Sequence, residues 1–177
     1  LPPAAVVERF NRLMLEEIQA EQYFTMALAV IDRRSGRLEL VQAGHPHPLL
    51  LRADGRVQKL GQGGLPVGLI AEAGFDAVSV QVHPGDRLVL CSDGFTECPL
   101  PNGRDFGEEG LIESLRASSH LSGSDLLEAM VWDLSRAAEV ETFPDDVSGI
   151  VLDLLTQEPC QHRAVPGVAQ PGQRLGD

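Results

Sequence analysis

Two groups of aspartates stand at the ends of apolar segments, where they could bind a metal ion. Residues 88–97 (LVLCSDGFTE) form an apolar run of strand length that stops at Asp93 and Gly94. Asp145 and Asp146 lie later in the chain and lead directly into another apolar run. Carboxylates held on strand ends suit Mg²⁺ or Mn²⁺, which prefer oxygen ligands and retain several waters. A pair of such ions can activate water and neutralise charge on a phosphoryl group.

The same acids also have a simpler structural interpretation. Asp93-Gly94 is a common turn dipeptide, and Asp145 could cap the entry to a strand. Acids at turns are abundant, so the spacing alone favours this structural interpretation.

Length and charge restrict the class of protein. The chain has 177 residues, which fits one domain with a proper core. Its net charge of −12 would repel a phosphate backbone, so we expect no binding to nucleic acid.

No apolar run is long enough to cross a bilayer, so we expect no membrane span. Cys91, Cys98 and Cys160 show no disulfide or zinc-ligand spacing, which fits a reducing, cytoplasmic location.

The hydrophobic pattern begins with a helix and continues with short strands. Residues 3–21 are expected to form an amphipathic helix with an apolar face made of Val6, Phe10, Leu13, Met14 and Ile18. The runs that read as strands, with Asp54-Gly55 as one hairpin turn, are 26–32, 37–43, 49–52, 57–60, 75–82 and 87–92. We expect the first of these strands to be covered on both faces.

Two helices and a last strand complete the pattern. We expect a helix over 108–117 and a second one after the capping-box pattern at 122–125. The last strand, 147–155, is apolar enough to be central. Helices and hairpin-linked strands segregated in this way indicate an α+β fold. The domain is expected over 1–155, followed by a flexible tail rich in proline and glycine over 156–177.

Residues 88–97 resemble the strand-Asp-Gly-x-Thr-Glu motif of the type 2C metal-dependent protein phosphatases, in their bacterial SpoIIE/RsbU-like branch. Further stretches match that branch in order: 43–46 (AGHP), 64–68 (GLPVG), 106–111 (FGEEGL) and 145–148 (DDVS). Each match is weak alone, but together they are specific over roughly residues 3–155.

The resemblance implies a four-layer α-β-β-α sandwich of antiparallel sheets flanked by helices. It also implies two Mn²⁺ or Mg²⁺ ions, with Asp93 and Asp145 as metal ligands. Asp146 would lie behind these ligands, and Gly94 would let water and substrate approach the backbone. No catalytic role is carried over to His45.

One family motif is missing. The family has a Gly-Asp-x-x-Gly-His-Gly-like segment whose aspartate bridges both metals, and the sequence contains no such segment. Because Leu1 falls where the family's second core helix would begin, we interpret the difference as an N-terminal truncation.

The resemblance implies a phosphatase for phosphoserine or phosphothreonine on an anti-sigma-factor antagonist, controlled by an upstream sensor or receiver domain in signalling or stress response. One alternative is an inactive phosphatase-like module that binds a regulator, and a weaker one is a small-molecule phosphohydrolase. The sequence leaves a homodimer open.

Overall fold

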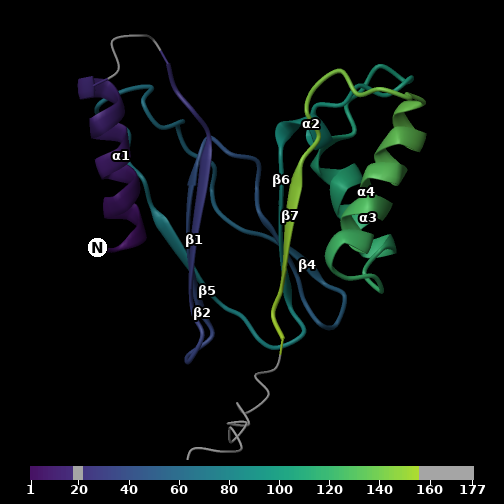
Figure 1. Ribbon diagram of the computed structural model, residues 1–177, viewed down its shortest axis with the longest axis horizontal. Helices are drawn as coiled ribbons and strands as arrows, with labels where there is room; N and C mark the ends of the chain where they lie inside the picture. Colours follow the sequence, from purple (N-terminus) through teal and green to yellow (C-terminus); the bar gives the residue numbers. More distant parts are fainter. Residues whose placement is uncertain (18–21, 156–177) are drawn as a thin grey trace, which may run out of the picture.

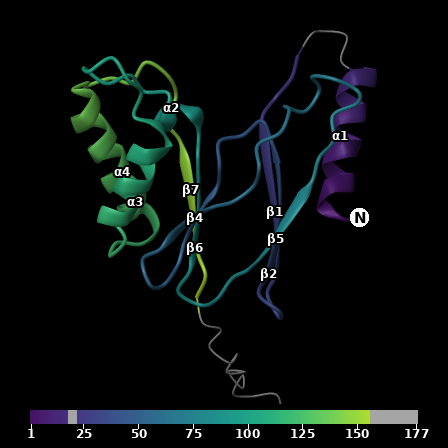
Figure 2. The ribbon, with the colours of Figure 1, turned by 180° about the vertical axis from the view of Figure 1, so that it is seen from behind.

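The computed structural model describes residues 1–17 and 22–155, which form four layers (Figure 1). Helix α1 (Pro3–Glu17) covers an antiparallel sheet of order β1-β2-β5. A second antiparallel sheet, of order β4-β3-β6-β7, stacks on the first and carries α3 and α4 on its outer face (Figure 2). The expected α+β fold with α-β-β-α layers is therefore confirmed.

The remaining elements follow the predicted order closely. They are β1 (Met26–Asp32), β2 (Arg37–Ala43), β3 (Leu49–Leu51), β4 (Val57–Lys59), β5 (Ala77–Gln81), β6 (Arg87–Cys91), α2 (Asp93–Thr96), α3 (Gly107–Ala117), α4 (Gly123–Ala138) and β7 (Gly149–Asp153). Strands β1 and β2 pair antiparallel, as do β3 and β4, which confirms both hairpins. Gly55, in the second turn, has φ +84°, a conformation that favours glycine.

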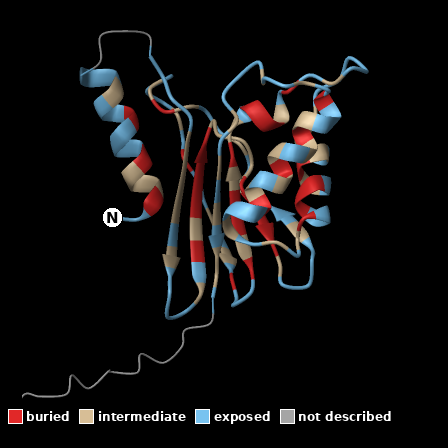
Figure 3. Cartoon of the chain, turned by 45° about the vertical axis from the view of Figure 1, so that its right-hand side comes forward, coloured by how far each residue is buried: buried red, intermediate tan, exposed pale blue. Residues whose placement is uncertain are grey.

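Three apolar clusters hold the layers together (Figure 3). Leu38, Leu40 and Leu88 are buried between the two sheets. Val7 of α1 packs with Val41 on the outer face of the first sheet. The third cluster joins β3 and β6 to the two long helices, and its fully buried members include Leu115, Leu126, Met130 and Leu134. Burying one such side chain contributes about 1.5–3 kcal/mol.

The buried face of α1 differs from the predicted one. Val7 and Asn11 are buried, whereas Phe10 is 46% exposed and Leu13 is 42% exposed. Asn11 is satisfied because its Nδ2 donates to Ile70 O (3.0 Å) and its Oδ1 accepts from Gly68 N (2.7 Å). A polar side chain whose donor and acceptor are both hydrogen-bonded can be buried at little cost. Helix α1 therefore faces the sheet with Val7 and Asn11 rather than with Phe10 and Leu13. Ile18, the last residue of the predicted stripe, lies outside the described residues.

Strands β1 and β7 are edge strands of their sheets in the described part of the chain. The predicted central position of the last strand is wrong, since Ile150 is 65% exposed. Cover on both faces of β1 is confirmed over most of the strand, because Met26 and Leu28 pack against the cluster under α1 and Ala29 and Ile31 pack against the cluster between the sheets. Val30 is the exception, with 47% of its surface exposed. An apolar run of strand length cannot by itself distinguish a central strand from an edge strand.

The start of α4 is held by a neighbouring strand. Ser122 occupies the N-cap position, but its side chain makes no capping hydrogen bond, so the predicted capping box is wrong. Instead, Gly123 N donates to Oδ2 of Asp153 on β7 (3.1 Å), whose Oδ1 pairs with Arg87 Nε (2.9 Å). Arg87 also donates to the carbonyl oxygens of Ser119 and Leu121. The connection between the two long helices is thus anchored to β6 and β7.

Within the described ranges, no helix is both long and apolar enough to span a bilayer.

We expect Glu139→Gly to stabilise the chain by about 1 kcal/mol. Glu139 ends α4 in the left-handed conformation, with φ +55°, and is the only non-glycine residue with positive φ among the described residues. Glycine adopts this conformation without steric cost. Urea unfolding measures the effect, with Glu139→Ala as the control that removes the charge but keeps the strain. Equal stabilities of the two variants would contradict this account.

Candidate metal centre

Asp93 lies directly beyond the end of β6. It is the first residue of the one-turn helix α2, so Asp93-Gly94 begins a helix rather than the predicted turn. The Asp93 side chain is exposed, and its Oδ1 accepts a hydrogen bond from Gly94 N (3.1 Å). Its backbone oxygen accepts from Glu97 N (2.7 Å), which closes the turn of helix. The carboxylate is therefore held at the end of a buried strand and faces solvent.

Asp145 and Asp146 lie in the segment that connects α4 to β7. Both are exposed, and Oδ1 of Asp145 accepts from Asp146 N (2.7 Å). Strands β6 and β7 pair antiparallel with Cys91 opposite Gly149. The segment before β7 therefore meets the segment after β6 at one end of the sheet, beside α2 (Figure 1).

Ser92 binds these two segments together. Its Oγ donates to Asp146 O (3.0 Å) and accepts from Ser148 N (3.0 Å). Its backbone N–H donates to Ser148 O (2.9 Å), which extends the strand pairing by one step. A single residue next to Asp93 thus fixes the backbone on both sides of Val147.

Gly94 allows the two segments to approach closely. A Cβ at this position would lie 2.9 Å from the carbonyl carbon of Asp146 and closer still to its oxygen. The obstacle would be backbone, which cannot rotate away as a side chain can. The close neighbour of Gly94 is therefore the Asp146 peptide, and the expected approach of water and substrate at Gly94 stays a prediction.

The structure places the acid segments side by side, but it does not bring together a complete set of metal ligands. Asp93 and Asp145 offer hard oxygen donors, which fit Mg²⁺ or Mn²⁺ bound through one or two carboxylates and several waters. Among the described residues, no group of three or more His, Cys, Asp or Glu side chains could hold a metal ion. The donor chemistry fits, and a two-ion centre needs at least one further carboxylate.

Two of the family-like segments turn out to pack against each other. Gly44 has φ +71°, and a Cβ there would lie 2.7 Å from Cγ of Pro66. Gln42 is 5% exposed and links the same segments, since its Nε2 donates to His45 O (2.6 Å) and its Oε1 accepts from Gly63 N (2.7 Å). Residues 43–46 therefore contact residues 64–68, and this contact gives both segments a structural role.

The sequence reasoning missed a cluster of charged groups at the start of α3. Glu108 accepts from Lys59 Nζ at Oε2 (2.8 Å) and lies against Nδ1 of His47 at Oε1 (2.5 Å). The hydrogen bond from Lys59, followed by that from His47, lowers the pKa of Glu108 below its ordinary value of 4.5. The cluster connects α3 to the β3–β4 hairpin. No local pattern could have revealed it, because its members are distant in sequence.

The thiols are unsuited to nucleophilic chemistry. Cys91 is buried, and burial raises its pKa to about 12. Burial also raises the pKa of Cys98, with a further contribution from the charge of Asp105. Thiols with raised pKa values remain protonated near neutral pH.

Gly94→Ala is expected to destabilise the chain by about 1–3 kcal/mol, because the added methyl group overlaps the Asp146 peptide. Gly74→Ala is the matched control, since a Cβ at Gly74 meets no atom within 4 Å and its φ is not positive. Urea unfolding of both variants measures the difference. A Gly94→Ala chain as stable as the control would show that the close approach imposes no constraint.

At neutral pH the Glu108→Gln variant is expected to have a lower free energy of unfolding than wild type. In acid the two free energies are expected to become equal. Because the folded-state pKa of Glu108 lies below 4.5, its carboxylate favours folding above that pH. The contribution disappears as the pH falls through the lowered folded-state value. Unfolding free energies across this range measure the convergence, with the exposed neighbour Glu109→Gln as control. A difference between wild type and Glu108→Gln that stays constant with pH would refute this assignment.

Comparison with known proteins identifies relatives of this chain. The family described as "Stage II sporulation protein E (SpoIIE)" matches residues 1–155. Protein IcfG of Synechocystis is 31% identical over 96 residues, which cover 54% of this chain and 15% of IcfG. Phosphoserine phosphatase RsbU of Bacillus subtilis is 26% identical over 151 residues, which cover 85% of this chain and 44% of RsbU. The chain thus spans less than half the length of these relatives.

Solved structures share the fold. The PP2C phosphatase domain of SpoIIE from Bacillus subtilis, with a fragment of its regulatory domain, has a TM-score of 0.75 at 21% identity. The match covers 90% of this chain and 46% of that one. The catalytic domain of the serine/threonine phosphatase PstP, in complex with two manganese ions, has a TM-score of 0.60 at 19% identity, covering 86% and 68%. With the family match over residues 1–155, these findings show that the chain belongs to the SpoIIE family and has the PP2C phosphatase fold.

Proposed function

We propose that residues 1–155 are the larger part of a metal-dependent phosphatase domain that removes phosphate from phosphoserine or phosphothreonine on a regulatory protein. The observation that carries this proposal is the junction of the Asp93 and Asp145 segments through Ser92 and Gly94. Two carboxylates from separate parts of the chain are held by backbone contacts at one end of the β6–β7 pair. A fold without chemistry does not need this arrangement.

Each residue of the junction has a distinct part in the proposal. Asp93 and Asp145 hold Mn²⁺ or Mg²⁺, and Asp146 supports the Asp145 position through the Ser92 contact. When bound, such an ion supplies an activated water and neutralises charge on the phosphoryl group. Ser92 keeps the two segments in register. The thiols take no part, in agreement with the raised pKa values of Cys91 and Cys98.

The cation is needed for electrostatic reasons as well. The connection to β7 exposes Glu141, Asp145 and Asp146, and α2 exposes Asp93. These carboxylates repel a phosphorylated substrate, in a chain whose net charge is −12. Divalent ions at the junction reverse the local charge and make phosphate binding favourable.

A further carboxylate completes the centre in this proposal. The family resemblance implies a bridging aspartate in a Gly-Asp-x-x-Gly-His-Gly-like segment, and the 177 residues contain no such motif. We assign that ligand to a part of the natural protein outside this sequence. Activity is therefore expected of the full natural protein.

The proposal extends to partners and location. The substrate is a phosphorylated protein of the anti-sigma-factor antagonist type, and a sensor or receiver domain upstream controls the phosphatase. RsbU, a phosphoserine phosphatase of which the match covers 44%, supports both a protein phosphatase activity and a larger domain context. The free thiols of Cys91 and Cys98 fit a cytoplasmic location.

A phosphatase-like module that binds a regulator without chemistry is the second candidate. It is favoured by one observation, the lack of a group of three metal-ligating side chains in the part of the chain that the structure describes. It predicts a full natural protein that lacks metal-dependent turnover but still binds its partner.

We expect Asp93→Asn and Asp145→Asn to lower manganese-dependent turnover by at least about 100-fold, since each removes a charged ligand. Release of phosphate from a phosphoserine peptide by the full natural protein measures this effect, and a chelator is expected to abolish the wild-type activity. Asp76→Asn, an exposed aspartate before β5, is the control. Unchanged turnover in either ligand variant would rule out the proposed centre.

A further inference from the structure

His45 lies at the same end of the second sheet as Asp93. The pairing of β3 with β6 sets Leu49 opposite Val89. Continuing this antiparallel register by four residues brings His45 opposite Asp93. The paired strands end before this point, because prolines at 46 and 48 have no N–H to donate and Asp93 begins α2. Both residues nevertheless leave the same end of the same strand pair.

The backbone around His45 is determined by its neighbours. Gly44 supplies the positive φ and the close approach to Pro66. Gln42 is buried and holds the carbonyl of His45 through its Nε2. None of these contacts involves the imidazole ring. These contacts fix the turn without the imidazole ring, whose one printed contact is the local one from Nδ1 to Pro46 O.

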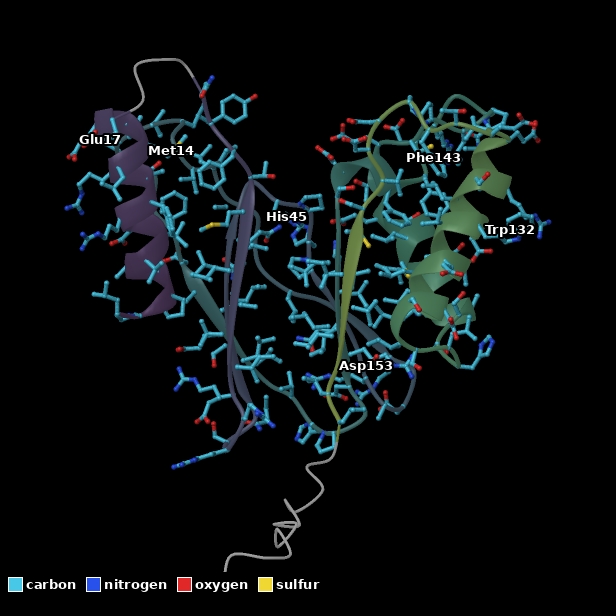
Figure 4. The ribbon with its side chains drawn as sticks, in the orientation of Figure 1. Met14, Glu17, His45, Trp132, Phe143 and Asp153 are labelled. Atoms are coloured by element: carbon cyan, nitrogen blue, oxygen red, sulfur yellow. The ribbon has the colours of Figure 1, made fainter. Side chains whose placement is uncertain are left out.

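The imidazole ring has one free nitrogen. Nδ1 of His45 donates to Pro46 O (2.8 Å), and the ring makes no other hydrogen bond or ion pair with the described residues. The side chain is half-buried and lies at the end of the space between the two sheets (Figure 4). His47, two residues later, differs because its ring is engaged with Glu108. Nε2 has no hydrogen-bond partner among the described residues in either ring, but only His47 is tied to a carboxylate through its Nδ1.

We propose that Nε2 of His45 binds a phosphoryl oxygen of the substrate. This inference rests on the proposed function and names one more residue of the same site. Asp93 and Asp145 can only accept hydrogen bonds when ionised, so a phosphoryl group beside them needs a donor from another segment. When both ring nitrogens carry a proton, Nδ1 donates to the carbonyl oxygen of Pro46 and Nε2 is left to donate to a phosphoryl oxygen. A charge-assisted hydrogen bond results.

Calorimetric titration of inorganic phosphate into the magnesium-loaded full natural protein tests the inference without relying on turnover. We expect His45→Ala to weaken phosphate binding by about tenfold, the loss typical of one charge-assisted hydrogen bond. His45→Arg restores a cationic donor and is expected to recover most of the affinity. His47→Ala is the matched control from the same segment and is expected to leave phosphate affinity unchanged while lowering the urea unfolding midpoint.

The outcomes separate this inference from the proposed function. Phosphate affinity in His45→Ala equal to that of wild type would overturn the inference, as would a wild-type protein that binds no phosphate. Equal losses in His45→Ala and His47→Ala, with equal losses of stability, would also overturn it, since they would show a structural role. Phosphate binding that depends on His45 in a protein without phosphatase turnover would support the inference while rejecting the proposed function.

Discussion

The contact between Gly94 and the Asp146 peptide is the constraint on which the candidate centre depends. Strands β6 and β7 bring their flanking segments to the same end of one sheet, and the lack of a side chain at Gly94 lets them approach. Ser92 then uses its hydroxyl group and its N–H to hold the second segment. Asp93 and Asp145 are placed by backbone packing, and each uses only Oδ1 in a hydrogen bond to the next backbone N–H, which leaves Oδ2 for a ligand.

The opposite end of the same strand pair is fixed by an ion pair. Arg87 at the start of β6 and Asp153 at the end of β7 pair with each other and with the connection between α3 and α4. Because the two helices cover the outer face of this sheet, the ion pair keeps the long apolar cluster in register with β6. Strand β6, which leads to Asp93, is thus held at both of its ends and is covered on one face by the two helices.

Much of the fold could be predicted from local patterns. Both hairpins and the two long helices follow from hydrophobic period and turn residues such as Gly55, which are properties of short segments. The wrong predictions concern residues whose burial or hydrogen bonding depends on a partner that is distant in the sequence. Asn11 is buried because Ile70 and Gly68 satisfy it, and Asp153 performs the capping that Ser122 was expected to perform. The position of β7 at an edge depends on strand order, which the sequence of the strand does not contain.

In the candidate centre, too, the local features could be predicted and the contacts between distant segments could not. Asp93 and Asp145 were identifiable because each follows or precedes an apolar strand, and the family resemblance connected them. Their approach depends on the β6–β7 pairing and on Gly94, and only the structure shows the Ser92 contacts. The cluster of Glu108, Lys59 and His47 was not predictable, since none of its members is close to another in the chain.

The most direct test is a crystal structure of the full natural protein soaked in manganese, with the metal located by anomalous diffraction. The account predicts a manganese peak about 2.1 Å from carboxylate oxygens of both Asp93 and Asp145, or a pair of ions that divides these ligands. A protein that binds manganese elsewhere, with both aspartates uncoordinated, would contradict it.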